Sequence, residues 1–318
     1  MAKKIISYIK SAADLITPHE ATRAGFVAMA LEKNFLASPF VEQAKILKVL
    51  ASQASVAKDL LSITELRDGL LTASGLSDKS LNYLSDVDKK NAINNLIECF
   101  LEPAGISFVD ELVYRFLIVK GDTLGGKTRN LAGALGEQKF LRAMIASFDL
   151  AGIAYQWLDS ESHTWKLATD AVGIEKRIKA LHWRDRLLYL NLKVPLVTKE
   201  GKKVDLILLN GDKAETFRGS DSILTHHRRY IALGELKAGI DPAGADEHWK
   251  TADMALKRIR ASFEGEGLNP HLFFIGAAIE KAMAREIFEQ IQNGTLSCAA
   301  NLTNEEQLAM ICQWIIGL

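Results

Sequence analysis

Apolar residues recur every three or four positions through the first third of the chain, which is the spacing of one face of an α-helix. This pattern predicts helices over 41–61, 63–74 and 86–101, with breaks at Pro39, Gly75 and the 103–105 segment. Up to about residue 118 no stretch alternates apolar and polar residues in the manner of a half-buried strand. The sequence therefore predicts an all-helical N-terminal domain over residues 1–118.

The pattern changes from residue 119 onward. The Gly-rich segment 121–137 is expected to form a loop that leads into a helix over 138–152. Apolar runs bounded by turn residues predict strands over 187–197, 204–210, 230–239 and 271–279, and helices are expected over 246–263, 280–293 and 303–317. Strands that alternate with helices predict a second domain, 119–318, of the α/β class, with a mixed central sheet flanked by helices.

Composition limits the class of protein. The formal net charge is zero, so a uniformly basic nucleic-acid coat is excluded, and any DNA binding must come from local basic patches. The three cysteines, Cys99, Cys298 and Cys312, lie far apart and form no CxxC pattern, which argues against structural zinc and a disulfide framework. No apolar run approaches the length of a membrane span, and no signal peptide is evident. A cytoplasmic protein with no membrane partner is expected.

Three chemically reactive residues fall in two of the apolar runs. Asp205 stands near the start of the 204–210 strand, and Glu235 and Lys237 lie in the 230–239 strand. Side chains two residues apart in a strand face the same side, so Glu235 and Lys237 point together. If the two strands are neighbours, Asp205 meets the other two side chains at one edge of the sheet.

These residue types suit the hydrolysis of a phosphodiester. Mg²⁺ prefers oxygen ligands and is usually held by one or two carboxylates, which Asp205 and Glu235 would supply, with the backbone carbonyl of Leu236 as a further ligand. Such a cation neutralises charge on the phosphate and lowers the pKa of the attacking water. The Lys237 ammonium would position that water or stabilise the developing charge. A D…ExK pattern by itself also occurs as a solvated strand face, and that alternative stays open.

A longer motif makes the pattern more specific. The segment 234–250, GELKAGIDPAGADEHWK, together with the Gly-rich segment 121–130, GDTLGGKTRN, resembles the AvaI/BsoBI family of type II restriction endonucleases. The resemblance implies a PD-(D/E)xK restriction-endonuclease-like core behind an N-terminal helical domain that embraces DNA. It also implies a homodimer that encircles double-stranded DNA and cleaves the degenerate palindrome C-pyrimidine-C-G-purine-G to leave 5′ overhangs. A cognate DNA methyltransferase is the expected functional companion.

The resemblance implies further site residues. A histidine shortly after the ExK motif is a candidate general base, and His248 matches that place; a surface or packing histidine is the alternative. An aspartate in the loop after the motif reads a base, which points to Asp241, although turn chemistry beside Pro242 also explains an aspartate there. In many PD-(D/E)xK folds a glutamate on the first core helix supports the metal site. Glu137 is the matching residue, and a favourable acid in a first helical turn explains it equally well.

Basic residues near these segments are candidates for contacts with DNA. Basic clusters of this kind are usually solvated loops, but beside a nuclease site contact with DNA phosphates is the expected role. Lys79 and Lys202 are also considered for base contact. The candidate DNA-binding residues are Lys79, Lys127, Arg129, Lys202, Arg228 and Arg229.

The segment 121–128 also matches the GxxxxGKT pattern of a P-loop, in which backbone amides cradle a phosphate. No convincing Walker B strand follows it, so a P-loop ATPase is kept only as an alternative. A structure-specific repair nuclease and a non-catalytic DNA-binding protein are two further alternatives. A repair nuclease would cut without a palindromic sequence requirement, and a non-catalytic protein would bind DNA but never cut it.

Overall fold

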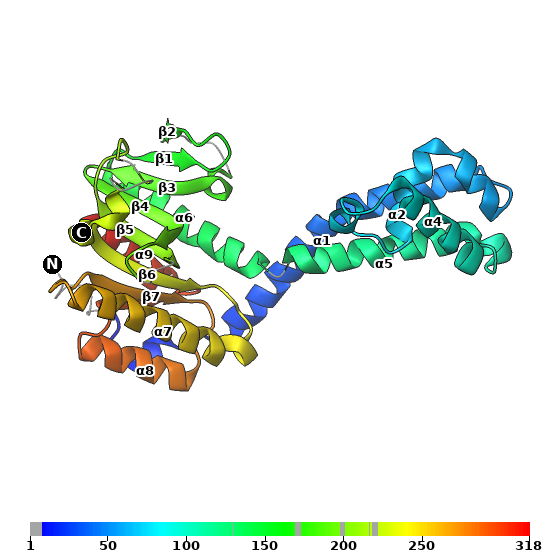
Figure 1. The fold of residues 1–318 in the computed structure, drawn as a ribbon. Helices are drawn as coiled ribbons and strands as arrows, with labels where there is room; N and C mark the ends of the chain where they lie inside the picture. The colour runs from blue at the N-terminus through cyan, green and yellow to red at the C-terminus, as the bar shows by residue number, and fades with distance from the viewer. Residues whose placement is uncertain (1–7, 129, 169–172, 198–200, 216, 218–221) are drawn as a thin grey trace. The chain divides into compact units, whose positions relative to one another are not determined.

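The structure is a computed structural model that describes residues 8–128, 130–168, 173–197, 201–215, 217 and 222–318. The chain divides into two compact units: a sheet unit, residues 1–26 and 132–318, and a helical unit, residues 27–131. The expected division into a helical domain, 1–118, and a catalytic domain, 119–318, stays a prediction. N-terminal helices followed by a mixed sheet with flanking helices are confirmed (Figure 1).

Helices build the helical unit around its own apolar core. Leu47, Leu70, Leu96 and Leu112 come from four different helices and are almost fully buried in that core. The helix that carries Leu47 begins in the sheet unit and ends in the helical unit. The helices are α1 (His19–Ala51), α2 (Arg67–Ala73), α3 (Asp78–Leu81), α4 (Asp86–Leu96) and α5 (Phe108–Thr128), and a π-helical turn, Ile97–Leu101, follows α4.

Two expected breaks in the helical region are wrong. α1 runs through Pro39, although an interior proline removes a helical hydrogen bond and clashes with the preceding turn. Ala44 and Leu47 beyond it pack into the core at helical spacing, and their burial offsets this cost. The Gly-rich segment is helical as well: α5 continues to Thr128 and α6 begins at Leu131. A glycine inside a helix costs about 1 kcal/mol relative to alanine, which the buried apolar residues of the two helices offset.

The P-loop alternative is wrong because the segment that matches the pattern is helical. A P-loop needs a run of backbone amides that is free to point at a phosphate. Residues 121–128 lie inside α5, where backbone amides donate to carbonyls one turn earlier. The match to the pattern is therefore a coincidence of sequence, and Gly121, Gly125 and Gly126 are helix residues.

Among the described residues, eight strands form one sheet in the order β2-β1-β3-β4-β5-β6-β7-β8 (Figure 1). Pairing is antiparallel from β2 to β6 and parallel from β6 to β8, with α7 and α8 as the crossovers. The strands are β1 (Gln156–Asp159), β2 (Trp165–Leu167), β3 (Ile178–Trp183), β4 (Arg186–Val194), β5 (Lys202–Asn210), β6 (Tyr230–Lys237), β7 (His271–Gly276) and β8 (Cys298–Asn301). The helices are α6 (Leu131–Ala151), α7 (Ala245–Glu264), α8 (Lys281–Gln292) and α9 (Glu305–Gly317).

Helices cover both faces of this sheet, as two neighbouring residues of β7 show. The ring of Phe273 packs on Trp314 of α9, with centroids 5.5 Å apart, and the ring of Phe274 packs on Trp249 of α7 at 5.0 Å. Consecutive strand residues point to opposite faces, so α9 covers one face and α7 the other. No helix of the described residues is long and apolar enough to cross a membrane.

The bounds of the long apolar strands and of the C-terminal helices lie within two residues of the sequence expectations. The ends of β4 and β7 are the exceptions, since each comes three residues early. The short strands β1, β2, β3 and β8 had no expected counterpart. They have three to six residues each, too few to show a clear period. Their place in the sheet is set by pairing with distant strands.

Candidate active site

The candidate site forms where β5 and β6 separate. The two strands are antiparallel neighbours, as expected, and their ladder ends at the pair Leu206–Gly234. Asp205 and Glu235 are the next residues on each strand. Beyond that pair β6 continues to pair with β7 as far as Lys237–Gly276, whereas β5 stays paired with β4. β5 therefore separates from β6, and the side chains that follow the last pair meet in the opening.

Three side chains converge in this opening. The Nζ of Lys237 donates to Oε2 of Glu235 at 2.6 Å and to Oδ2 of Asp205 at 2.8 Å. The same Oδ2 of Asp205 accepts a hydrogen bond from the backbone N–H of Leu236 at 3.0 Å. The Asp205 carboxylate thus takes the place of a strand partner for β6 and is held against the ExK motif by two donors.

Burial gives the cluster unusual electrostatics. Glu235 is only 4% exposed, and burial together with the nearby Asp205 carboxylate raises the pKa of Glu235 to about 7, against the lowering effect of Lys237. Burial by itself would lower the pKa of Lys237, but the Glu235 and Asp205 carboxylates outweigh it and raise that pKa. Lys237 therefore keeps its proton and acts as a cation, whereas Glu235 binds a proton readily when no other cation is near.

The donor set fits a hard divalent cation. Two carboxylates converge on the Lys237 ammonium group, and Mg²⁺ is usually held by one or two carboxylates. Within a strand the N–H and C=O of one residue point to the same neighbour, and the N–H of Leu236 points at Asp205. The carbonyl of Leu236 therefore faces the same opening. The described residues contain no group of three or more His, Cys, Asp or Glu side chains arranged to hold a metal ion.

The loop after β6 lies under His248. A Cβ atom placed on Gly239 would be 3.1 Å from Nε2 of His248, so the imidazole covers a glycine two residues beyond Lys237. His248 is exposed in the first turn of α7. Asp241 is exposed too, and its carboxylate accepts a hydrogen bond from the N–H of Ala243 at 3.0 Å. The turn chemistry considered for Asp241 is therefore present, and a role in reading a base stays a prediction.

Glu137 has a partner that sequence reasoning missed. It lies in the second turn of α6 rather than at a helix start, because α6 begins at Leu131. Its Oε1 accepts a hydrogen bond from Nδ2 of Asn191 in β4 at 2.6 Å. Asn191 has a φ of 54°, and a lone asparagine in an apolar run gives no sequence signal of that conformation. A role for Glu137 in the metal site stays a prediction.

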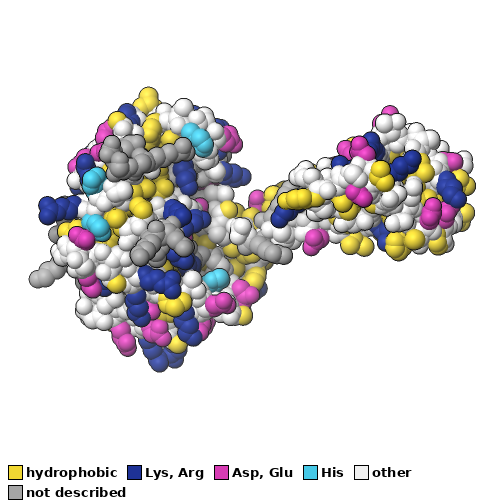
Figure 2. Space-filling model, in the orientation of Figure 1, with side chains coloured by type: hydrophobic (Ala, Val, Ile, Leu, Met, Phe, Trp, Pro, Cys, Tyr) yellow, Lys and Arg dark blue, Asp and Glu magenta, His cyan; other side chains and the backbone are white. Residues whose placement is uncertain are grey.

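The candidate DNA contacts are mostly exposed basic residues. Lys202 at the start of β5 and Arg228 are exposed, and Arg229 donates to the carbonyl of Asn210 at 3.3 Å. Lys79 is exposed in α3 of the helical unit. Figure 2 shows Lys and Arg side chains over the middle and lower part of the sheet unit, with Asp and Glu side chains among them in the lower part. Arg129 and the side chain of Lys127 lie outside the described residues.

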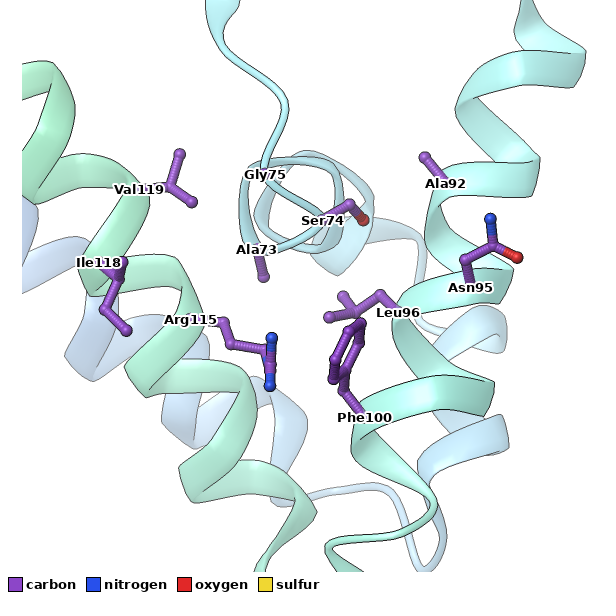
Figure 3. A pocket seen from close by; sticks show the side chains of 10 residues that line it. All are labelled: Ala73, Ser74, Gly75, Ala92, Asn95, Leu96, Phe100, Arg115, Ile118 and Val119. Carbon is purple, nitrogen blue, oxygen red and sulfur yellow. The ribbon is translucent and has the colours of Figure 1, made fainter.

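The helical unit has a separate pocket of about 420 Å³. Figure 3 shows the Arg115 guanidinium beside the Phe100 ring, 3.8 Å from its centroid, with apolar side chains around them. Arg115 also pairs with Glu111 at 2.7 Å. The described residues that line this pocket include neither an expected site residue nor a carboxylate that could bind a cation.

Comparison with known proteins agrees with the resemblance in sequence. The family model described as restriction endonuclease BsobI matches residues 6–318. Two relatives described as type II restriction enzyme AvaI, from Nostoc sp. and Anabaena variabilis, are each 49% identical over 316 residues, which cover 98% of both chains. Type II restriction enzyme BsoBI from Geobacillus stearothermophilus is 49% identical over 327 aligned positions, which cover 99% of both chains.

Identity of this extent leaves no part of the fold outside the comparison. The match includes the helical unit, the eight strands and the opening between β5 and β6. The resemblance carried by segments 121–130 and 234–250 is thereby confirmed. The chain belongs to the AvaI/BsoBI family of type II restriction endonucleases, enzymes that cut DNA at specific sites.

Proposed function

We propose that Asp205, Glu235 and Lys237 form the cleavage site of this restriction endonuclease, in a core of the PD-(D/E)xK type, and that Mg²⁺ is its metal. The observation that carries the proposal is the ammonium group of Lys237, hydrogen-bonded to both carboxylates where β5 and β6 part. Restriction endonucleases are typically metal-dependent, and Asp205, Glu235 and the carbonyl of Leu236 would hold the ion. When bound, Mg²⁺ would neutralise charge on the scissile phosphate and acidify the attacking water.

The residues of the chain would divide the remaining work. Lys237 has a raised pKa and stays protonated, so it stabilises negative charge on the phosphate and does not accept a proton. His248 carries an exposed imidazole over the loop that follows Lys237, and imidazoles exchange protons near neutral pH. We assign His248 the role of general base toward the attacking water.

The proposed substrate is double-stranded DNA with the palindrome C-pyrimidine-C-G-purine-G, cut to leave 5′ overhangs. A two-fold site is read most simply by a two-fold protein, so we propose a homodimer in which each subunit cuts one strand. Asp241, Lys202 and Lys79 would contact bases, and Arg228, Arg229, Lys127 and Arg129 would contact phosphates. A methyltransferase of the same specificity would protect the host DNA, and the cytoplasmic location expected from the sequence stays a prediction.

The test is digestion of a plasmid of known sequence with and without Mg²⁺, followed by mapping of the ends. Cuts only at C-pyrimidine-C-G-purine-G sites, and only with the metal, are expected. Asp205→Asn and Glu235→Gln should bind the same duplex but cut it slower by about 100- to 1000-fold or more, whereas Glu247→Gln, an exposed acid of α7, should cut normally. Metal-free cleavage, or a normal rate for Asp205→Asn, would refute the proposed site. Cuts without a palindromic requirement would favour a repair nuclease.

A further inference from the structure

β4 and β5 change faces at Asn191 and Asp205. Before this point, Tyr189 of β4 and Ile207 of β5 pack in the hydrophobic cluster that also contains Trp249 of α7. Beyond it, the members of the same cluster are Val194 and Val204. In a regular strand the residues on one face are an even number apart, yet Ile207 and Val204 are three apart, as are Tyr189 and Leu192, which also packs on this cluster.

The strand pairing and the backbone angles place this change of faces at the same two residues. The register of β4 and β5 is identical on both sides, with Leu190 opposite Leu206 and Leu192 opposite Val204. Asn191 and Asp205 stand between these pairs and are not themselves paired. Asn191 is in the left-handed region, with a φ of 54°, a conformation that most side chains disfavour and that asparagine tolerates best after glycine. The change of faces in the β4–β5 pair is therefore centred on Asn191 and Asp205.

Two hydrogen bonds hold the backbone at this change of faces. The carboxamide of Asn191 donates to Glu137 of α6 at 2.6 Å, and Nζ of Lys179 in β3 donates to the carbonyl of Leu190 at 3.0 Å. α6 itself is seated by a glycine: a Cβ atom on Gly136 would lie 2.1 Å from the Cβ of Ala238. Glu137 is thus a fixed acceptor on a helix that touches the residue directly after Lys237.

We propose that Asn191 is a positioning residue for DNA cleavage: bonded to Glu137, it holds the left-handed turn that frees Asp205 from strand pairing and directs its carboxylate to Leu236 and Lys237. A regularly paired Asp205 would follow the alternation of β5. In the structure its Oδ2 instead accepts from the Leu236 N–H and the Lys237 ammonium. In this arrangement Glu137 is an anchor for Asn191, which is an alternative to the metal-site role expected from the sequence, and it needs only to accept a hydrogen bond. This inference rests on the proposed role of Asp205.

The experiment exchanges donor and acceptor. Asn191→Asp sets a carboxylate against Glu137, so it should weaken Mn²⁺ binding in calorimetric titrations, and raise the Mg²⁺ concentration for half-maximal single-turnover cleavage, by about 10–100-fold. Adding Glu137→Gln restores a donor–acceptor pair of reversed direction, so the double variant should recover to within a few-fold of the wild type. Asn191→Gly keeps the left-handed backbone without the anchor and should show the same metal defect if Asn191→Asp does not fold.

A matched control and Asp205→Asn complete the panel. Arg184 also has a left-handed backbone, with a φ of 51°, in the exposed turn between β3 and β4, so Arg184→Asp should bind metal and cleave normally. Wild-type metal binding in both Asn191→Asp and Asn191→Gly, or a double variant no better than Asn191→Asp, would overturn the role of Asn191. Normal cleavage by Asp205→Asn would instead overturn the proposed site, so the two failures can be distinguished.

Discussion

Gly136 of α6 lies so close to Ala238 that a Cβ atom on the glycine would be 2.1 Å from the Cβ of the alanine. Atoms of two side chains cannot approach to that distance, so the glycine is required for this contact. Ala238 directly follows Lys237, and Glu137 directly follows Gly136. The close approach therefore sets the distance between α6, whose Glu137 accepts a hydrogen bond from Asn191, and β6, which ends in the ExK motif.

Gly136→Ala should destabilise the enzyme, although alanine is the better helix former. Overpacking of a tight contact costs about 1–3 kcal/mol, which exceeds the gain of about 1 kcal/mol from helix propensity. Gly133→Ala is the matched control: Gly133 lies in the same helix, and a Cβ atom there would have no described atom of another segment within 4 Å. This control should be neutral or stabilising. Urea unfolding of both variants measures the difference, and equal or greater stability of Gly136→Ala would contradict the argument.

The raised pKa of Glu235 predicts how Mg²⁺ stabilises the fold at different pH. A carboxyl group titrates near 4.3 in the unfolded chain and at about 7 in the folded protein, where burial and then Asp205 disfavour its charge. Its contribution to stability is complete below about pH 4.3 and is lost as the pH rises through 7. Mg²⁺ competes with the proton for this group, so it binds more tightly at pH 8 than at pH 6.

Thermal unfolding with and without Mg²⁺ checks this expectation. A ligand present at about a hundred times its Kd adds about 2.7 kcal/mol to the free energy of unfolding, so the melting temperature should rise more at pH 8 than at pH 6. In Glu235→Gln the Mg²⁺ shift should be small at both pH values. An equal shift of the wild type at pH 6 and pH 8 would show that Glu235 does not exchange a proton for the metal.

The central part of the site could be predicted from the sequence because it depends on short-range rules. The two-residue period of a strand places Glu235 and Lys237 on one side, and the apolar runs around them identify two buried strands that follow one another along the chain. The approach of Asp205 to Lys237 at 2.8 Å needed only that these strands be neighbours. The alternation rule does not fail at the ExK motif, so the expectation was correct there.

The surroundings of the site could not be predicted because they depend on contacts between distant segments. The left-handed backbone of Asn191 breaks the alternation of β4, and its hydrogen bond reaches 54 residues back along the chain to Glu137. The glycines of α5 and α6 suggested a loop, since glycine disfavours helices in isolation. Only the packing partner of Gly136 explains why a glycine is found within a helix at that position.

An ion cluster around the buried Asp159 carboxylate at the end of β1 should govern acid stability. Asp159 is fully buried and accepts hydrogen bonds from Lys166, Arg177 and Ser162. The hydrogen bond from Lys166 is the main reason that the pKa of this carboxyl lies well below its usual range, against the effect of burial. A depressed folded pKa contributes stability above the unfolded value of about 3.9, and this is lost as the pH falls toward the folded pKa.

Asp159→Asn should therefore be less stable than the wild type from pH 7 down to about pH 4, by a constant amount, and the difference should shrink at lower pH. Urea unfolding at several pH values measures it. Asp246→Asn is a suitable control, since Asp246 is an exposed acid of α7 whose ion pair with Lys250 is on the surface; such pairs contribute little. A difference for Asp159→Asn that grows below pH 4 would have the wrong sign for this cluster.

The last prediction separates His248 from Glu235 as the source of an acid limb in the pH–rate profile. Both groups would reduce cleavage below neutral pH: Glu235 because its proton competes with the metal, and a histidine base because a protonated imidazole accepts no proton. Saturating Mg²⁺ at every pH removes the first effect, since a metal-bound carboxylate stays ionised. An acid limb that persists under saturation therefore belongs to the base.

His248→Ala should then cleave more slowly by about 100- to 10,000-fold, the usual contribution of a general base, and should lose the persistent limb. Lys237→Ala should also be slow, from lost charge stabilisation, but should keep the limb. His226→Ala removes another exposed imidazole of the sheet unit and should match the wild type. Single-turnover cleavage of a short duplex across neutral pH gives the profiles. If His248→Ala has the wild-type rate and profile, the imidazole over Gly239 takes no part in proton transfer, and another group must accept the proton of the attacking water.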